Sequence, residues 1–505
     1  MIKILSFEES FSYDIHSLAQ AFFPGEEVKV SKDFQEEEAD YLLSLSPKEA
    51  ILSGERDCVF SGSTQSVLLF ADAFGKAEQA VFPADIARPL LKSEIKRLIY
   101  RCLSKWLGKT LPWGTLTGIR PTKIAMDLLK QGEGEEAVLA RMEEWYLASS
   151  KKSLLALEIA QREKRFIERI AHPEGYSFYI GIPFCPTRCL YCSFASNPIG
   201  KFRNQTGRYL AALFKELEAA SKLTAGRHLD SLYIGGGTPT ALSEEELEAL
   251  LEKVEAYFSP TEIEYTLEAG RPDSITKEKL ALMKRFGITR ISVNPQTMNQ
   301  KTLDLIGRQH SVEQTFSAYE MARDMGFGNI NMDIILGLPG EGEEEVRNTL
   351  AGISKLRPDS LTVHSLAVKR ASRLKEELTY NAAASKKNLA EEPPKPSHKS
   401  REMNALMEMA ESYAQEMGLV PYYLYRQKNM AGNLENVGYA KEGFFGAYNV
   451  LMMEEVQDIV ACGAGTISKK VYPDGRIERA DDVKDLHQYC ERIEEMLERK
   501  RRLFS

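Results

Sequence analysis

The central part of the chain alternates between short apolar runs and helix-like segments, and this alternation restricts the possible folds more than any other feature. Each run has the length of a β-strand, and most gaps between runs hold one amphipathic segment. Strands that alternate with helices form parallel β-α units. The runs lie at residues 176–182, 231–234, 264–269, 289–295, 330–338 and 361–368, and the helix-like segments lie at 206–222, 241–257, 275–286, 311–325 and 342–355.

Six such units are too few for a closed eight-stranded barrel. We therefore predict an α/β fold with a partial (β/α)6 barrel, in which ligands gather where the strands end. Spacing of apolar residues also predicts helices at 92–108, with Cys102 in its apolar face, at 151–170, near 401–417 and near 482–502. The predicted parts are an N-terminal α+β region over residues 1–165, the barrel core over 170–375, a linker over 376–400 and a C-terminal α+β domain over 401–505.

Composition and charge exclude several classes of protein. The 505 residues are 43% hydrophobic and 27% charged, which is typical of a folded globular chain. The net charge of −8 makes neither nucleic acid nor an anionic membrane the expected partner. No segment reaches the ~20 apolar residues of a membrane-spanning helix, and the first residues lack a signal-peptide pattern. We therefore expect a cytoplasmic protein.

Three of the seven cysteines fall within eight residues, directly after the first central apolar run. Cys185, Cys189 and Cys192 form a C-x3-C-x2-C pattern. A redox pair would leave Cys185 unexplained, and a zinc site would need paired ligands that neither His172 nor Cys462 supplies. An iron–sulfur cluster fits the spacing better. A [4Fe–4S] cluster normally takes four thiolates, so three would leave one iron open for a substrate or cofactor.

The segment YIGIPFCPTRCLYC, from Tyr179 to Cys192, resembles the cluster loop of radical S-adenosylmethionine (SAM) enzymes. Its IPFC approach and the aromatic Tyr191 resemble the oxygen-independent coproporphyrinogen III oxidase branch. The resemblance implies that the three cysteines hold a [4Fe–4S] cluster whose open iron chelates SAM, and that the reduced cluster cleaves SAM to methionine and a 5′-deoxyadenosyl radical. The stretch WGTLTGIRPTK at residues 113–123 resembles the HemZ subgroup of this branch, which carries an extra N-terminal region.

Further motifs follow successive apolar runs in chain order. They are GGGTPT at 235–240, GRQH at 307–310 and DIILGLPG at 333–340, with a looser match at GAGTIS, residues 463–468. The glycines would let a ligand approach the backbone, although a tight turn also explains them, and the polar residues could be ordinary strand-end side chains. The resemblance implies that one or two SAM molecules contact Tyr179, Tyr191, Gly236, Gly237, Thr238, Glu268, Gln296, Arg308 and Asp333. No catalytic side chain is predicted, because SAM carries the radical.

The resemblance implies an anaerobic step of haem biosynthesis. Two propionates of coproporphyrinogen III would be oxidatively decarboxylated to vinyl groups, with flavodoxin or ferredoxin as the electron donor. The aromatic, amide and basic stretch at 421–449 is either a Tyr-rich edge of the core or a lid over the substrate. Basic residues that could clamp propionates are Arg188, Lys201, Arg203, Lys369, Arg370, Arg426 and Lys428.

Two departures from the family pattern keep other functions open. The oxidase motif has a further cysteine two positions after its last ligand, where this chain has Phe194. The haem-chaperone branch has an H-N-x-x-Y-W segment that this chain lacks. The alternatives are a radical SAM enzyme that methylates or degrades haem, and a haem carrier with an axial ligand among His310, His364, His398 and His487.

Overall fold

The computed structural model describes residues 2–6, 8–24, 26–32, 41–47, 65–72, 77–83, 85–118, 120–170, 172, 174–194, 196–367, 396–426 and 434–505. The chain divides into two compact units. The first unit comprises Met1–Glu158, Glu392–Asn404 and Arg426–Leu434, and the second comprises Ile159–Glu391, Ala405–Tyr425 and Glu435–Ser505.

The first unit is built on a five-stranded sheet with the order β2-β1-β3-β4-β5. The helices α1 and α3 bury their apolar faces in one core with this sheet, and that core includes the fully buried Cys102, as the spacing predicts. α3 ends where Gly108 takes a left-handed conformation, which only glycine adopts without strain. The strands are β1 (Ile2–Ser6), β2 (Val28–Ser31), β3 (Tyr41–Pro47), β4 (Gln65–Asp72) and β5 (Ala77–Pro83), and the helices are η1 (Glu9–Phe11), α1 (Ser12–Phe22), α3 (Arg88–Leu107), α4 (Pro121–Lys130), α5 (Glu135–Ala140) and η2 (Arg141–Trp145). The division between units falls inside α6 (Ser150–Ile170).

The second unit contains the predicted partial barrel. Six strands pair in parallel and in chain order, so the carboxyl end of each strand lies at the same edge. They are β6 (Tyr176–Ile182), β9 (Leu229–Gly236), β10 (Glu264–Glu268), β11 (Arg290–Ser292), β12 (Ile330–Leu336) and β13 (Ser360–Ser365).

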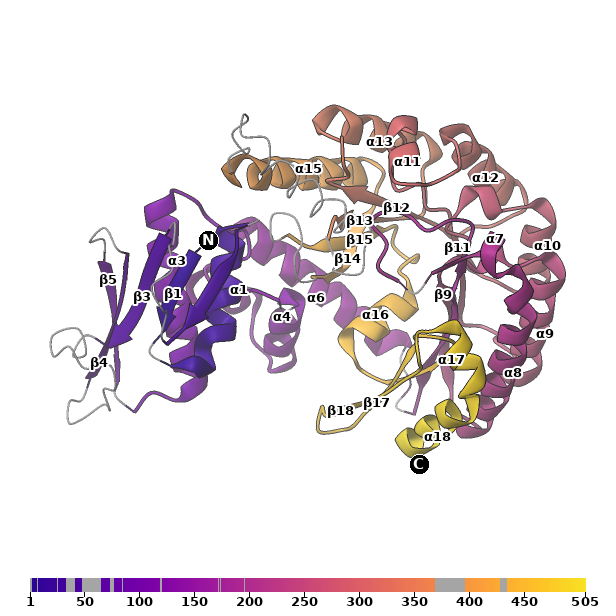
Figure 1. Cartoon of the computed structure of the whole chain (residues 1–505), viewed down its shortest axis with the longest axis horizontal. Helices are drawn as coiled ribbons and strands as arrows, with labels where there is room; N and C mark the ends of the chain where they lie inside the picture. The colour runs from indigo at the N-terminus through magenta and orange to yellow at the C-terminus, as the bar shows by residue number, and fades with distance from the viewer. Residues whose placement is uncertain are drawn as a thin grey trace. The chain divides into compact units, whose positions relative to one another are not determined.

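Helices fill the gaps between these strands and cover the outer face of the sheet (Figure 1). Two of them, α9 and α12, begin with complete capping boxes, at Ser243 and Ser311, which explains why their starts are visible in the sequence. The helices are α8 (Thr206–Leu223), α9 (Glu244–Phe258), α10 (Lys277–Arg285), α11 (Gln300–Leu305), α12 (Val312–Asp324) and α13 (Glu343–Leu356), with the short elements α7 (Ile199–Phe202), η3 (Arg203–Gln205), η4 (Pro239–Ala241) and η5 (Pro272–Ser274).

The C-terminal region extends this same sheet on both sides to eleven strands. β16 (Asp458–Cys462) pairs in parallel with β6 and leads into the antiparallel β17 (Ile467–Val471) and β18 (Ile477–Asp481), while β15 (Asn436–Ala440) and β14 (Val420–Tyr425) join the edge at β13. α16 (Ala447–Glu454) lies on the inner side of the sheet, away from the outer helices (Figure 1).

Two predictions for this region are changed by the structure. The prediction of a single closing helix near 482–502 is wrong. Two helices, α17 (Leu486–Glu491) and α18 (Ile493–Phe504), lie there, because Arg492 between them leaves helical geometry with φ −105° and ψ 25°. The second prediction is the linker over residues 376–400. Its residues 376–395 lie outside the described residues, whereas residues 396–400 form the beginning of α15 (Pro396–Glu416). The domain boundaries stay predictions.

No helix among the described residues is both long enough and apolar enough to cross a membrane.

Candidate active site

The cysteine loop lies at the carboxyl edge of the parallel sheet, directly after β6. It opens with the two-residue strand β7 (Phe184–Cys185), which pairs with β8 (Asn197–Pro198). Two hydrogen bonds fasten the loop to the segment after α11: the Leu190 N–H donates to the Ile306 carbonyl, and the Thr187 hydroxyl donates to the Gly307 carbonyl, both at 2.9 Å. These contacts fix the loop against the segment that leads to Arg308.

The glycine run after β9 packs against the cysteine loop. A Cβ atom on Gly237 would lie 2.5 Å from the Phe184 carbonyl oxygen and 2.9 Å from the Cys185 sulfur, so only glycine fits. The N–H groups of Gly237 and Thr238 donate to the carbonyls of Ile182 and Phe184, at 2.8 and 2.7 Å. These two N–H groups are engaged within the chain, which leaves the bare glycine surface as the part of the run that a ligand could approach.

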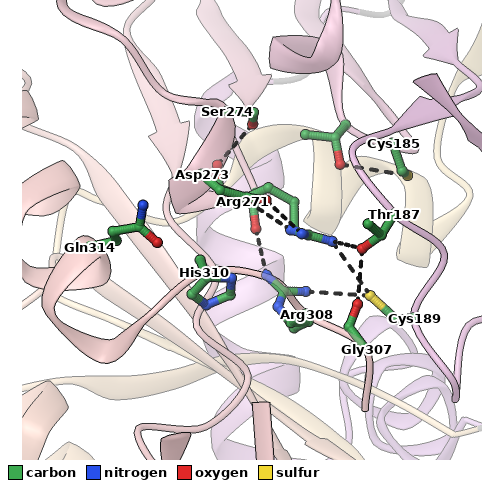
Figure 2. Close-up of polar contacts among 12 residues, drawn as sticks. Cys185, Thr187, Cys189, Arg271, Asp273, Ser274, Gly307, Arg308, His310 and Gln314 are labelled. Atoms are coloured by element: carbon green, nitrogen blue, oxygen red, sulfur yellow. Dashed lines mark hydrogen bonds and ion pairs between the residues drawn. The ribbon is translucent and has the colours of Figure 1, made fainter. Parts of the chain in front are cut away.

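Two buried guanidinium groups point at the sulfur of Cys189 (Figure 2). A nitrogen of Arg271 lies 3.9 Å from this sulfur, and a nitrogen of Arg308 lies 4.0 Å from it. Arg271 is fixed by a two-point contact with Asp273, and Arg308 donates to the Gly270 carbonyl at 2.9 Å and to the Asn294 carbonyl. Arg308 is 4% exposed, so its guanidinium is buried and does not belong to a surface ion pair. Two buried positive charges therefore face the Cys189 sulfur.

The three sulfurs fit a cluster better than a single metal ion. Among the described residues, the only set of three or more His, Cys, Asp or Glu ligand atoms that all lie within 4.8 Å is elsewhere in the chain. Ligands of one tetrahedral zinc ion lie about 4 Å apart or less. Burial raises the pKa of the Cys185 thiol to about 12 and also raises that of Cys192. A metal group that binds these thiols must therefore displace their protons.

Buried polar atoms without a hydrogen-bond partner gather beside the cysteine loop. Within the described residues they include the side-chain oxygens of Asn294 and Gln296, the Nε atom of Arg308, and both ring nitrogens of His310. Burial and the charges of Arg308 and Arg271 lower the pKa of His310 to about 3, so this imidazole is neutral. An unpaired buried polar atom costs about 1–3 kcal/mol, and a polar ligand would remove that cost. The residues therefore fit a ligand such as SAM, with its amine, carboxylate and ribose hydroxyls.

Gln296 also has an unusual backbone. Its φ of 70° lies in the left-handed region, which a non-glycine residue adopts only where its surroundings enforce it. Its N–H donates to the Asp333 carbonyl, and its own carbonyl accepts from the Ile335 N–H, both at 2.9 Å. These bonds to β12 hold the side chain at the strand-end edge.

Two carboxyl groups of the sheet, Glu268 at the end of β10 and Asp333 in the middle of β12, have opposite electrostatics. Burial raises the pKa of Glu268 to about 7, with a further contribution from Asp333, while the Tyr233 hydroxyl donates to Glu268 at 2.5 Å. Burial alone would also raise the pKa of Asp333, but His364 and the amide of Asn331 hold it below its ordinary value. Glu268 is therefore the group that changes charge near neutral pH.

Three stacked tyrosines line the inner side of the barrel beside Glu268. The rings of Tyr179 and Tyr233, on the neighbouring strands β6 and β9, are 5.9 Å apart and nearly parallel. Tyr448 of α16 stacks on both, at 5.7 and 4.7 Å. Glu264 accepts hydrogen bonds from the Ala447 and Tyr448 N–H groups and so fixes the start of α16. The stretch 421–449 thus contributes an aromatic face to this site.

The remaining predicted residues, Tyr191 and the basic residues that could clamp propionates, lie in several different parts of the chain. Tyr191 contacts Arg308 through its hydroxyl at 3.3 Å, and Arg188 lies in the cysteine loop. Arg203 forms an ion pair with Glu246, Lys201 is exposed, and Arg426 belongs to the first unit, where it donates to the Leu116 carbonyl at 2.6 Å. The remaining predicted clamps lie outside the described residues, namely Lys369, Arg370 and Lys428.

The histidines considered as haem ligands also have different settings. His310 is buried beside the cysteine loop, and His487 is exposed next to Glu491. Both ring nitrogens of His364 are in use, one 3.1 Å from the Tyr425 hydroxyl and the other 3.8 Å from Asp333. The side chain of His398 lies outside the described residues.

Sequence reasoning missed several residues of the site. Arg271 and Asp273 follow β10, and Asn294 follows β11. Their position directly after a strand, at the edge where ligands gather, is the signal that could have identified them. Tyr233 carries no such signal, because it is an ordinary strand residue, whereas Tyr448 lies within the aromatic stretch 421–449 that was predicted as a possible lid.

The comparisons with known proteins agree with this geometry. Residues 179–352 match the Radical SAM superfamily, which is the class that the partial barrel and its cysteine loop define. The oxygen-independent coproporphyrinogen-III oxidase-like protein HemZ of Bacillus subtilis is 39% identical over 477 residues, which cover 92% of this chain and 90% of that protein. The chain belongs to this HemZ family of oxygen-independent coproporphyrinogen-III oxidase-like proteins.

Other relatives are similar over a shorter range. The heme chaperone HemW of Bacillus subtilis is 36% identical over 38% of this chain and 50% of its own length. The solved structure of coproporphyrinogen III oxidase (HemN) from Escherichia coli, described as a radical SAM enzyme, is 24% identical and covers 66% of this chain and 73% of its own, with a TM-score of 0.48. Membership of the radical SAM superfamily confirms the predicted cofactors, a [4Fe–4S] cluster and SAM.

Proposed function

We propose that this chain oxidatively decarboxylates propionate side chains of coproporphyrinogen III to vinyl groups, giving protoporphyrinogen IX in haem biosynthesis in the cytoplasm. Cys185, Cys189 and Cys192 hold the cluster, and SAM occupies the strand-end edge next to them. When bound, the cluster and SAM supply a 5′-deoxyadenosyl radical. The observation that carries the proposal is the group of unpartnered buried polar atoms near the cysteine loop, because the polar groups of SAM would satisfy them.

The residues around this edge have separate roles in the proposal. Arg271 and Arg308 neutralise negative charge at the cysteine loop, from 3.9 and 4.0 Å. Gln296 and Asp333 supply polar contacts to SAM, and Glu268 accepts hydrogen bonds from its ribose. A carboxylate is the acceptor that two hydroxyl groups require.

The aromatic stack supports a flat apolar substrate. Tyr179, Tyr233 and Tyr448 present parallel rings on the inner side of the barrel, and a tetrapyrrole macrocycle can stack on such a face.

For each propionate, one hydrogen atom passes to the radical, CO2 leaves, and the remaining electron passes to a one-electron acceptor. Reduced flavodoxin or ferredoxin supplies the electron that starts each cycle.

Anaerobic turnover tests the proposal. The reconstituted protein is incubated with SAM, a low-potential reductant and coproporphyrinogen III, and the porphyrins are oxidised and separated by chromatography with mass detection. We expect vinyl products and one 5′-deoxyadenosine for each vinyl group, and neither product with the variant Cys189→Ala. SAM cleavage without vinyl formation would contradict the proposed substrate.

The haem carrier is the second candidate, since the chain is similar to a heme chaperone over part of its length. It predicts tight stoichiometric haem binding and no SAM cleavage in the same assay. A haem-modifying enzyme predicts instead that haem, and not coproporphyrinogen III, is consumed together with SAM.

A further inference from the structure

A second cluster of ligand-type side chains lies at the opposite edge of the parallel sheet from the cysteine loop. His172 precedes β6, while His228 and Asp230 stand at the start of β9. β6 is seven residues long, so this cluster is about 20 Å from the cysteine loop. Among the described residues, it is the only set of three such side chains whose ligand atoms all lie within 4.8 Å of one another.

The three side chains converge on one oxygen atom. The Nδ1 atoms of His172 and His228 each lie 2.7 Å from Oδ1 of Asp230. The two imidazole rings stack, with centroids 3.5 Å apart and an angle of 29° between their planes. The Asp230 side chain is fully buried, whereas the histidine side chains are 52% and 48% exposed. A cation could therefore reach the cluster from solvent and find a carboxylate at its base.

Further hydrogen bonds orient the Asp230 carboxylate. Its other oxygen, Oδ2, accepts from the His172 backbone N–H at 3.2 Å and, in the amide orientation that satisfies Gln457, from that side chain at 2.7 Å. Arg227, the residue before His228, forms its salt bridge with Asp458, at 2.9 Å. Among the described residues, no lysine or arginine forms a salt bridge with Asp230. The two histidines are therefore the only groups in these ion pairs that can face the buried carboxylate with a positive charge or share a metal ion with it.

The ligand chemistry selects a class of metal. Two imidazole nitrogens and one carboxylate oxygen suit zinc and other divalent first-row transition metals, whereas calcium and magnesium prefer oxygen ligands alone. Metal–ligand bonds of about 2.0–2.2 Å place tetrahedral ligand atoms about 3.3 Å apart. The observed spacing of 2.7 Å is shorter than this, so metal binding would move the two half-exposed histidines outward and separate their stacked rings.

We propose that His172, His228 and Asp230 form a binding site for a divalent transition-metal ion of the zinc type, distinct from the iron–sulfur site. The ion joins the segment before β6 to the start of β9. It thereby fastens the two strands whose far ends carry the cysteine loop and the glycine run. Gln457 and the His172 N–H orient the carboxylate, as outer-shell partners do in metal sites.

Zinc binding to the holoenzyme tests the proposal. The anaerobic protein with its iron and sulfide measured is dialysed against Zn²⁺ alone, and bound zinc is counted by mass spectrometry. We expect the double variant His172→Ala/His228→Ala to bind one zinc fewer per chain than the unaltered protein. The variant His487→Ala, which removes an exposed histidine elsewhere, should bind as much as the unaltered protein.

A milder variant guards against an effect of misfolding. His228→Gln keeps the size and polarity of the side chain, and we expect it to lower zinc affinity by more than the 10- to 100-fold that loss of an outer-shell partner causes. Zinc should also raise the melting temperature of the unaltered protein and of His487→Ala, but not that of the double variant. Equal zinc stoichiometry and affinity in all of these proteins would overturn the proposal and leave a hydrogen-bonded cluster without a metal.

Discussion

At the scale of single residues, Glu268 makes the clearest prediction about pH. Its folded pKa is raised by burial from 4.5 to about 7, so the folded chain binds more protons than the unfolded chain between these values. Stability should therefore fall as pH rises through this window, by up to about 3 kcal/mol from this group alone. Glu268→Gln should remove that part of the decline, which urea unfolding at pH 5 and pH 8 would measure. The exposed Glu252→Gln is the matched control, and an unchanged pH difference in Glu268→Gln would contradict the assignment.

Arg308 makes a separate electrostatic prediction. Its guanidinium lies 4.0 Å from the Cys189 sulfur, and a positive charge close to a cluster ligand raises the reduction potential. Arg308→Gln should lower the potential, on the order of 60 to 120 mV for a screened charge at this range. Arg308→Lys keeps the charge and should lower it less. An EPR-monitored redox titration of the three proteins measures the shift, and equal potentials in all three would show that the charge does not act on the cluster.

At the scale of elements, the glycine run and the cysteine loop depend on each other. A methyl group at position 237 meets a backbone carbonyl and the Cys185 sulfur, neither of which can turn away as a flexible side chain would. Gly237→Ala should therefore displace the loop and reduce iron and sulfide per chain after anaerobic reconstitution to less than half. The control is Gly207→Ala in α8, where nothing lies within 4 Å and alanine favours the helix by about 1 kcal/mol. Full iron content in Gly237→Ala would show that the loop tolerates the methyl group.

The elements also show which parts of the fold could be predicted from the sequence. The strands and helices of the barrel were predictable because their signals are local: an apolar run for β6, a capping box at Ser243 for α9. The pairing of β16 with β6 was not, because it joins segments almost 300 residues apart and no local pattern specifies a partner. For α16, the aromatic stretch 421–449 indicated a possible lid, but the stacking of Tyr448 on Tyr179 and Tyr233 could not be predicted from a local pattern.

The features of the candidate site also differ in whether the sequence could predict them. Glu268, Gln296 and Asp333 were predicted from the family resemblance, and the parallel strands that carry or precede them are the local signal that supports it. Two other features could not be predicted, because they depend on atomic positions across neighbouring strands. One is the hydrogen bond of the Gly237 N–H within the chain, and the other is the convergence of His172 and His228 on Asp230. Sequence spacing therefore identifies which edge holds a site, while the side-chain contacts decide which groups remain available to a ligand.

At the scale of the whole molecule, the division into two compact units predicts two unfolding transitions. All three tryptophans, Trp106, Trp113 and Trp145, lie in the first unit, and the proposed SAM site lies in the second. Each unit has its own sheet, so each can unfold as a separate cooperative body. Tryptophan fluorescence should therefore follow the first unit alone, while far-ultraviolet circular dichroism follows both.

SAM distinguishes the two transitions. Without reductant SAM is not cleaved, and at 100 times its Kd it should stabilise the second unit by about 2.7 kcal/mol, because it binds only the folded form. In thermal unfolding followed by both signals, SAM should raise the circular-dichroism transition of the second unit and leave the fluorescence midpoint unchanged. Cys189→Ala, which lacks the ligand at the centre of the cysteine loop, should show no shift in either signal. Coincident curves that move together on adding SAM would instead show that the two units unfold as one.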